Sequence, residues 1–342
     1  MKKIFLLGVA ALSLVACDDN KENEPAATNN VVKVSASIGQ SSVSSRTDCD
    51  TKWDKGDVIG ISSIVGGLRT PFVNLEYTTL NGDGEFTGET PIFFYKPMTL
   101  LAYYPFTGTE GTAPGTDGVI KADTKIEMQA PGKQNLIDFL WDARQDKVDF
   151  SVANPTVNFQ LSHMMSKLTF TFLKSEETRD NHNVIIAKGV DVGDMISYGI
   201  NGLGLVGTFD TYTGVCAIDE EEEARSMLTV TFDKGTVENE KPMPSLIVFP
   251  QTQPADDNFT LHITTSEVDQ YGQVLPDQHY KCVLPFSDKE IKAGYHYKFT
   301  VQVTKVGLIL GEMSIEEWKP AREWSGTATI DGNIFGTEET DD

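Results

Sequence analysis

A strictly alternating stretch lies near the C-terminal end of the sequence and reads Tyr297-Lys298-Phe299-Thr300-Val301-Gln302-Val303-Thr304. Every second side chain is large and apolar, and the side chains between them are polar or charged. This period of two is typical of a β-strand that buries one face. Shorter stretches of the same kind occur at residues 32–38, 157–161, 168–172, 228–232 and 261–265. Because turn signals separate them, the sequence predicts an all-β sandwich architecture.

Turn and cap signals stand between the predicted strands. Asn81-Gly82-Asp83-Gly84 is a tight-turn signal between two extended stretches. Its acidic spacing resembles a calcium loop, but Phe86 stands where such a loop requires Gly and no Glu closes it, so we reject a calcium site there. Ser287 and Glu290 form a capping box, which predicts one short helix.

One dinucleotide-binding fingerprint is present as Gly202-x-Gly204-x-x-Gly207. That motif requires a helix directly after the glycines, because the pyrophosphate binds at the helix N-terminus. Here residues 208–213 have the composition of a strand and a turn. We therefore expect no nucleotide cofactor at these glycines.

The N-terminal 17 residues have the layout of a secretory signal peptide. Lys2 and Lys3 precede an apolar run, which ends at Leu14-Val15-Ala16-Cys17. The run is shorter than the ~20 apolar residues that a membrane-spanning helix needs. A Cys after a Leu-x-Ala exit resembles a bacterial lipobox, so residues 1–16 are predicted to be removed and Cys17 to be acylated. An ordinary signal peptide with an incidental Cys is the alternative. Residues 17–30 are polar and acidic, and they predict a flexible tether.

Charge and length limit the classes of function and the number of domains. The 342 residues include 50 acidic and 28 basic side chains, which gives a formal net charge of −22. Such a surface repels nucleic acid and anionic headgroups. The length favours two domains, and a polar stretch before Pro155 predicts the boundary, with domains at residues 31–155 and 156–342.

The sequence lacks the residue patterns of the common catalytic and metal sites. It contains no G-x-S-x-G elbow, no H-E-x-x-H helix and no phosphate loop. Cys49, Cys216 and Cys282 are an odd set without C-x-x-C spacing, so a zinc site is not expected, and their disulfide status stays open. His163, between Leu161 and Met164, is interpreted as a hydrogen-bonded core residue. We expect no catalytic residue, no cofactor, no metal and no enzymatic activity.

Eight short motifs, in this order, resemble those of the fimbrillin-like proteins of Bacteroidetes, the subunits of type V pili. They are Arg46-Thr47, Trp53-x-x-Gly56-Asp57-x-Ile59-Gly60-Ile61, Ala102-Tyr103-Tyr104-Pro105, Asp138-Phe139-Leu140-Trp141-x-Ala143, Phe159-x-x-Ser162-His163-x-x-Ser166-Lys167-Leu168, Phe249-Pro250-Gln251, Ala293-Gly294-Tyr295-x-Tyr297 and Ile315-x-x-Trp318. Each motif alone is weak, but together they cover nearly the whole chain after Cys17.

The resemblance implies a fold and a mode of assembly. The fold would be two tandem transthyretin-like, Greek-key β-sandwich domains. The protein would be exported as a lipoprotein, held at the cell outer membrane by its lipid and exposed at the surface. An arginine-specific protease would cleave it, and it would join other fimbrial subunits, either copies of itself or minor pilins, by donor-strand exchange.

The residues make this mechanism physically plausible. The strand with Val32, Val34, Ala36 and Ile38 precedes a polar stretch and a candidate cut between Arg46 and Thr47. At roughly 1.5–3 kcal/mol for each large buried side chain, emptying the sites of Val32, Val34 and Ile38 costs about 5–9 kcal/mol. A whole domain is stable by only ~5–15 kcal/mol. A strand from another subunit would be favoured in the empty groove. An ordinary surface arginine in a loop is the alternative reading of Arg46.

Residues 321–342, with a partly alternating stretch at 324–330, are the candidate donor strand. The sequence leaves the roles of stalk, anchor and tip subunit open, together with any adhesion ligand. A non-polymerising surface lipoprotein that binds glycan or another host ligand is the second hypothesis. A secreted hydrolase is the third, and it has no motif in its favour.

Overall fold

The structure is a computed structural model that describes residues 31–39, 52–65, 68–69, 71–94, 98–146, 155–187, 189–220, 225–253, 258–269, 271–305 and 307–318. Four of the sequence-based assignments lie outside these residues. They are the lipid attachment at Cys17 with its tether, the cleavage site at Arg46 and Thr47, the thiol of Cys49, and the C-terminal segment 321–342.

The described residues form β-strands and a few 3₁₀ turns, with no α-helix among them, so the expected all-β class is confirmed. No helix in this part of the chain is long and apolar enough to cross a membrane. The 3₁₀ turns are η1 (Ile126–Met128), η2 (Gln134–Leu136), η3 (Val192–Asp194) and η5 (Ser287–Lys289).

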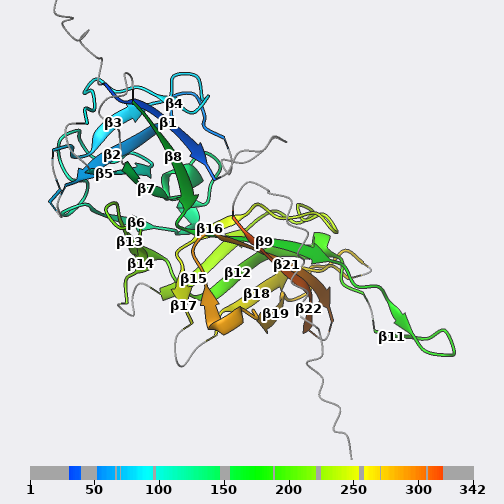
Figure 1. Ribbon diagram of the computed structural model, residues 1–342. Coiled ribbons are helices and arrows are strands. Elements are labelled where there is room, and N and C mark those ends of the chain that lie inside the picture. Colours follow the sequence, from blue (N-terminus) through cyan, green and yellow to red (C-terminus); the bar gives the residue numbers. More distant parts are fainter. Residues whose placement is uncertain are drawn as a thin grey trace, which may run out of the picture.

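The first sheet has seven strands and closes on itself (Figure 1). In spatial order its strands are β3 (Leu75–Thr78), β2 (Val58–Ile64), β5 (Met98–Tyr104), β7 (Leu140–Asp146), β8 (Thr156–His163), β1 (Lys33–Ile38) and β4 (Glu85–Phe86). Neighbours are antiparallel except β8 and β1, which are parallel. A bridge joins the two ends of this order, because Thr78 and Thr87 exchange backbone hydrogen bonds of 2.8 and 3.0 Å. The apolar faces of the strands enclose one core.

Two four-stranded sheets enclose a second core. One sheet contains β16 (Leu246–Val248), β9 (Ser166–Leu173), β21 (Tyr295–Thr304) and β22 (Gly307–Glu317). The other contains β15 (Arg225–Thr231), β12 (Met195–Gly204), β18 (Thr260–Thr265) and β19 (Gln278–Val283). Phe170 of β9, Phe299 of β21 and Tyr198 of β12 are buried where the two inner faces meet. The alternation at residues 297–304 therefore has the predicted cause, one face in this core.

A three-stranded sheet joins the two assemblies (Figure 1). It contains β14 (Cys216–Ile218), β13 (Val206–Asp210) and β6 (Val119–Asp123). β6 pairs with β13 over five residues, although the two strands are far apart in the sequence. A third apolar cluster, which includes Tyr103, Phe139, Phe209 and Phe249, lies beside this pairing. Two small pairs complete the structure, β10 (Thr178–Arg179) with β11 (Ile185–Ala187), and β17 (Gln251–Thr252) with β20 (Glu290–Ile291).

The strands and turns bear on two local predictions, the glycine fingerprint and the capping box. Gly202 and Gly204 lie in β12 and Gly207 lies in β13, so the glycine fingerprint belongs to strands, as expected. The capping box is wrong in detail. A single 3₁₀ turn forms at Ser287–Lys289, but its N-cap is Phe286, which has no polar side chain to cap it. Asp288, with a φ of 56°, also departs from helical geometry.

The division into tandem transthyretin-like domains with a boundary near Pro155 stays a prediction. The pairing of β8 bears on where the boundary would lie. β8 begins at Thr156 and pairs with β7 and β1 of the first sheet, whereas β9, which begins at Ser166, pairs with β16 and β21. Residues 156–163 therefore belong to the first sheet.

Candidate functional site

β1 lies between two other strands and contacts both through its backbone. It pairs in parallel with β8 along its whole length, from Lys33 opposite Thr156 to Ile38 opposite Leu161. On its other side it pairs antiparallel with β4, and the N–H of Ala36 donates to the carbonyl of Gly84 at 2.8 Å. The strand is therefore an inner member of the closed sheet.

The side chains of β1 divide by face as the sequence predicts. Val32, Val34, Ala36 and Ile38 are each at most 5% exposed and belong to the first core. Lys33 is exposed, and the Ser35 hydroxyl on the same face donates to the Asn158 side-chain carbonyl of β8. The first core thus depends on a strand at the very start of the described chain.

Trp53 holds β1 in place from the side of the first core. Its indole N–H donates to the carbonyl of Ala36 at 2.7 Å. Its ring packs edge-on against Phe86 and Tyr104, with centroids 5.1 and 5.4 Å away. Gly84 is essential to this contact, because a Cβ there would lie 2.7 Å from the Ala36 oxygen. The sequence shows Trp53 only as part of a motif and does not predict its contact with β1.

The Asp57 carboxylate supports the aromatic contacts around Trp53. It accepts hydrogen bonds from the Tyr104 hydroxyl at 3.2 Å and from the Asp54 N–H at 2.7 Å. Burial raises the pKa of Asp57 above its ordinary value, although these two hydrogen bonds oppose the rise. The motifs around Trp53 and Tyr104 thus meet beside β1.

A second cluster, the junction cluster, consists of Asp138, His163, Lys167, Gly294 and Trp318. His163 Nδ1 lies 2.8 Å from Asp138 Oδ1, and both side chains are at most 3% exposed. The imidazole stacks on the Trp318 ring with centroids 3.9 Å apart and planes 5° apart. The ammonium of Lys167 lies 5.5 Å from the centre of that ring. Four of the eight sequence motifs therefore converge on one buried point, which spacing in the sequence could not reveal.

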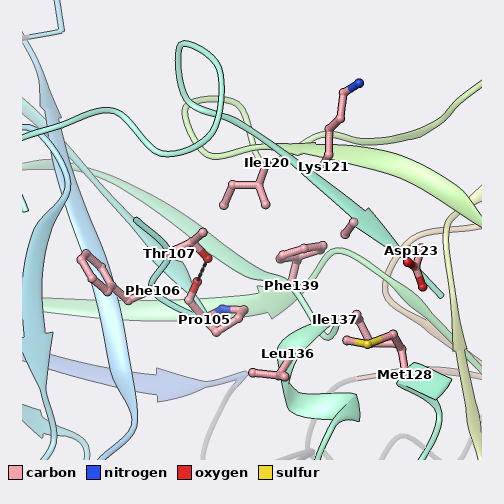
Figure 2. Close-up of a pocket in the computed structure, with 11 residues that line it drawn as sticks. Pro105, Phe106, Thr107, Ile120, Lys121, Asp123, Met128, Leu136, Ile137 and Phe139 are labelled. Atoms are coloured by element: carbon pink, nitrogen blue, oxygen red, sulfur yellow. Dashed lines mark hydrogen bonds between the residues drawn. The ribbon is translucent and has the colours of Figure 1, made fainter. Parts of the chain in front are cut away.

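A cavity of about 360 Å³ lies beside the sheet that joins the two assemblies (Figure 2). Its walls are mostly apolar and include Phe106, Ile120, Leu136 and Phe139. Figure 2 shows the side chain of Lys121 extending away from the cavity. No pair of titratable groups converges in the lining, so its chemistry is that of apolar contact.

The thiols and acidic groups give no reactive centre in the described residues. Cys216 and Cys282 are free and half-buried. Burial raises the pKa of Cys282 to about 11 and that of Cys216 still further, so neither is a ready nucleophile at neutral pH. The part of the chain that the structure describes holds no group of three or more His, Cys, Asp or Glu side chains that could bind a metal ion.

Solved structures share the fold over nearly their whole length, including three from species of Bacteroides. A candidate cell adhesion protein of Bacteroides ovatus has a TM-score of 0.62 and 24% identity, and the match covers 85% of this chain and 99% of that chain. A second, from Bacteroides uniformis, has a TM-score of 0.58 and 20% identity, covering 85% and 100% of the two chains. A fimbrial protein of Bacteroides vulgatus has a TM-score of 0.55 and 13% identity, with the same coverage.

Comparison of sequences adds a relative and a family. A candidate fimbrium subunit of Bacteroides uniformis, Fim1C, is 25% identical over 333 residues, which are 94% of this chain and 96% of that protein. The model of the fimbrillin-like family matches residues 45–318. Because this match covers most of the sequence, the chain belongs to the fimbrillin-like family.

Proposed function

We propose that this protein is a structural or accessory subunit of a surface fimbria that supports cell adhesion. It is exported as a lipoprotein through Cys17, cleaved after Arg46, and assembled by exchange of the strand that contains Val32, Val34, Ala36 and Ile38. Its partners are other fimbrial subunits, either copies of itself or minor pilins, together with an arginine-specific protease and, through the lipid, the outer membrane. Proteins of the fimbrillin-like family are non-enzymatic, so the absence of catalysis expected from the sequence is confirmed by the family.

The placement of β1 is the observation that carries the proposal. This strand is the first element of the described chain, it lies inside the sheet, and it is buried on one face. Cleavage after Arg46 separates it from the other strands that the structure describes, because each of these begins at Val58 or beyond. Its removal leaves β8 and β4 with unpaired backbone groups around an open apolar groove, which another strand can fill.

The energies also favour refilling of the groove. Each large apolar side chain of β1 contributes roughly 1.5–3 kcal/mol through burial, and an unpaired buried backbone group costs about 1–3 kcal/mol. A typical domain is stable by only ~5–15 kcal/mol. The cleaved protein would therefore be marginal alone and strongly stabilised by an incoming strand.

Residues 321–342 are the proposed donor. In this arrangement the segment of one subunit enters the β1 position of the next, with alternate apolar side chains facing the core. Shortening the chain after residue 320 should abolish multimers while leaving cleavage at Arg46 unchanged. Multimers that persist after this deletion would exclude the segment as the donor.

Cleavage followed by a multimer assay tests the proposal. The chain without its signal peptide is treated with an arginine-specific protease, the new N-terminus is sequenced, and the product is run unheated on a denaturing gel. We expect a start at Thr47 and a ladder of multimers that disappears on heating. Arg46→Ala should remain uncleaved and monomeric, whereas Arg69→Ala, a matched change in another segment, should behave as the wild type. A chain that is cut at Arg46 yet stays monomeric would contradict strand exchange.

The glycan-binding alternative predicts different results in the same assay. A non-polymerising surface lipoprotein would stay monomeric after cleavage and would bind carbohydrate saturably. Isothermal titration with glycans is then the deciding measurement.

A further inference from the structure

The junction cluster fixes the last described residue of the chain. Trp318 follows β22 directly and is only 5% exposed. Its backbone N–H donates to the Gly294 carbonyl at 2.6 Å, and its ring stacks on His163. Gly294 has a φ of 73°, which favours glycine, and a Cβ at this position would lie 3.1 Å from the His163 carbonyl. The chain is therefore held at this residue by its backbone and by its side chain together.

His163 is itself held rigidly, so the contact is with a fixed point. It is the last residue of β8, where it pairs with Leu140 of β7. The next two residues are also fixed by backbone hydrogen bonds. The Met164 N–H donates to the Phe139 carbonyl at 2.8 Å, and the Gly294 N–H donates to the Met165 carbonyl at 2.8 Å. Trp318 thus packs at the end of β8, the strand that pairs with β1. This end of β8 lies near Ile38 at the end of β1, since Ile38 pairs with Leu161.

The indole nitrogen of Trp318 is unusual for a buried tryptophan. The indole N–H of Trp318 is buried and has no hydrogen-bond partner in the described part of the chain. A buried tryptophan normally finds an acceptor for this group. The stack needs only the aromatic ring, so we expect phenylalanine to replace tryptophan here in function.

We propose that Trp318 is a positioning residue for assembly: its stack on His163 fixes the end of the described fold, and so the place from which the attached donor segment can reach a neighbouring subunit. The inference rests on the proposed donor role of residues 321–342. A fixed starting point holds an attached segment in fewer orientations, which lowers the entropy lost when the segment binds a neighbouring subunit.

The first measurement concerns the exit point alone. A fluorophore is attached to a clickable side chain at residue 322, and its anisotropy is measured in the otherwise full chain. We expect high anisotropy in the wild type and in Trp318→Phe, and a clear drop in Trp318→Ala. Equal anisotropy in the wild type and Trp318→Ala would overturn the proposal.

The second measurement separates donor from acceptor. The donor-only chain carries Arg46→Ala and keeps β1 and residues 319–342, and the acceptor-only chain is cleaved after Arg46 and ends at residue 320. Trp318→Ala in the donor-only chain should slow formation of the mixed dimer about tenfold, because the donor segment then loses more conformational freedom on binding. The same change in the acceptor-only chain should leave the rate unchanged, and Trp318→Phe should behave as the wild type in either role. Equal slowing in both roles would show a general loss of stability and overturn the proposal.

A synthetic peptide of residues 321–342 distinguishes failure of this inference from failure of the proposed function. If the peptide binds the acceptor-only chain and Trp318→Ala has no effect in the donor-only chain, the positioning role is wrong and strand exchange stands. If the peptide does not bind, the donor role of this segment is wrong, and the positioning role falls with it.

Discussion

Asp138 and His163 form a buried pair in which each polar side chain depends on the other. The two atoms in contact are 2.8 Å apart, and burial leaves water little access to either group. Asp138→Ala is expected to lower the free energy of unfolding by about 2–4 kcal/mol, because it leaves the buried imidazole without its carboxylate. Urea unfolding measures this change. The double variant Asp138→Ala with His163→Phe should lose less than the sum of the two single variants, and strict additivity would contradict the pairing.

The thiol of Cys282 makes a pH-dependent contribution to stability. Its pKa is about 11 in the folded chain, against about 8.5 for an unperturbed thiol. Since the unfolded state releases this proton first, the contribution is complete below pH ~8.5 and is lost as the pH rises towards 11. Burial raises the pKa of Tyr103 and Tyr104 as well, which adds to the loss at high pH. Thermal melts between pH 7 and pH 10.5 should show a smaller alkaline loss for Cys282→Ala than for the wild type. An equal loss in the two proteins would contradict this assignment.

Single residues show where sequence reasoning succeeded and where it could not. The interpretation of His163 as a hydrogen-bonded core residue is confirmed, since it is 2% exposed and contacts Asp138. Its partners could not be predicted, because Asp138 and Trp318 are 25 and 155 positions away in the sequence. The same holds for the hydrogen bond from Trp53 to Ala36, which requires knowledge of which strands are neighbours.

At the scale of elements, Gly84 and Gly56 allow a direct test of how closely β1 packs. Both have positive φ, 86° and 93°, so alanine is strained at either position. Only at Gly84 would the added Cβ also meet β1, at 2.7 Å from the Ala36 oxygen, whereas at Gly56 it meets nothing within 4 Å. Gly84→Ala should therefore destabilise the protein by about 1–3 kcal/mol more than Gly56→Ala, in the range seen for overpacking. Equal losses of unfolding free energy for the two variants in chemical unfolding would mean that β1 shifts to accommodate the added methyl group.

The elements with clear alternation were predictable, whereas several of the others were not. β1, β8, β9, β15, β18 and β21 all lie where a period of two was found. β12 contains Gly199, Gly202 and Gly204, and β22 has no regular alternation, so neither gave a strand signal. The pairing of strands could not be predicted from the sequence either. Nothing local indicates that β1 runs parallel to β8 or that β6 pairs with β13, because both are contacts over long sequence separations.

For the whole molecule, the contacts between the two assemblies predict unfolding in one step. β6 pairs with β13, Phe139 stacks on Phe209 at 4.5 Å, and the Gln129 side chain exchanges two hydrogen bonds with the backbone of Ile247. Calorimetry of the uncleaved chain should give one transition with equal calorimetric and van't Hoff enthalpies. Phe209→Ala should lower the stability by about 3–5 kcal/mol, as expected for a large buried side chain. Two separated transitions in the wild type would contradict this coupling.

Length and composition predicted two structural units, and the structure contains two large cores with a smaller third between them. The third core mixes residues from both units, for example Tyr103 with Phe209. No property of the sequence marks that mixing, since each contributing stretch is apolar in the same way as any core strand. The boundary and the tandem transthyretin-like arrangement therefore stay predictions.

The Thr78–Thr87 bridge turns seven strands into a ring, and a ring with one member missing has a single gap with a wall on each side. A strand that enters must match β8 and β4 at once. A shift by one residue would fail at both walls and would also turn its apolar side chains outward. In the proposed strand exchange, a misplaced strand would therefore be rejected for two separate reasons. The register of the proposed exchanged strand would then follow from the closure of one small ring.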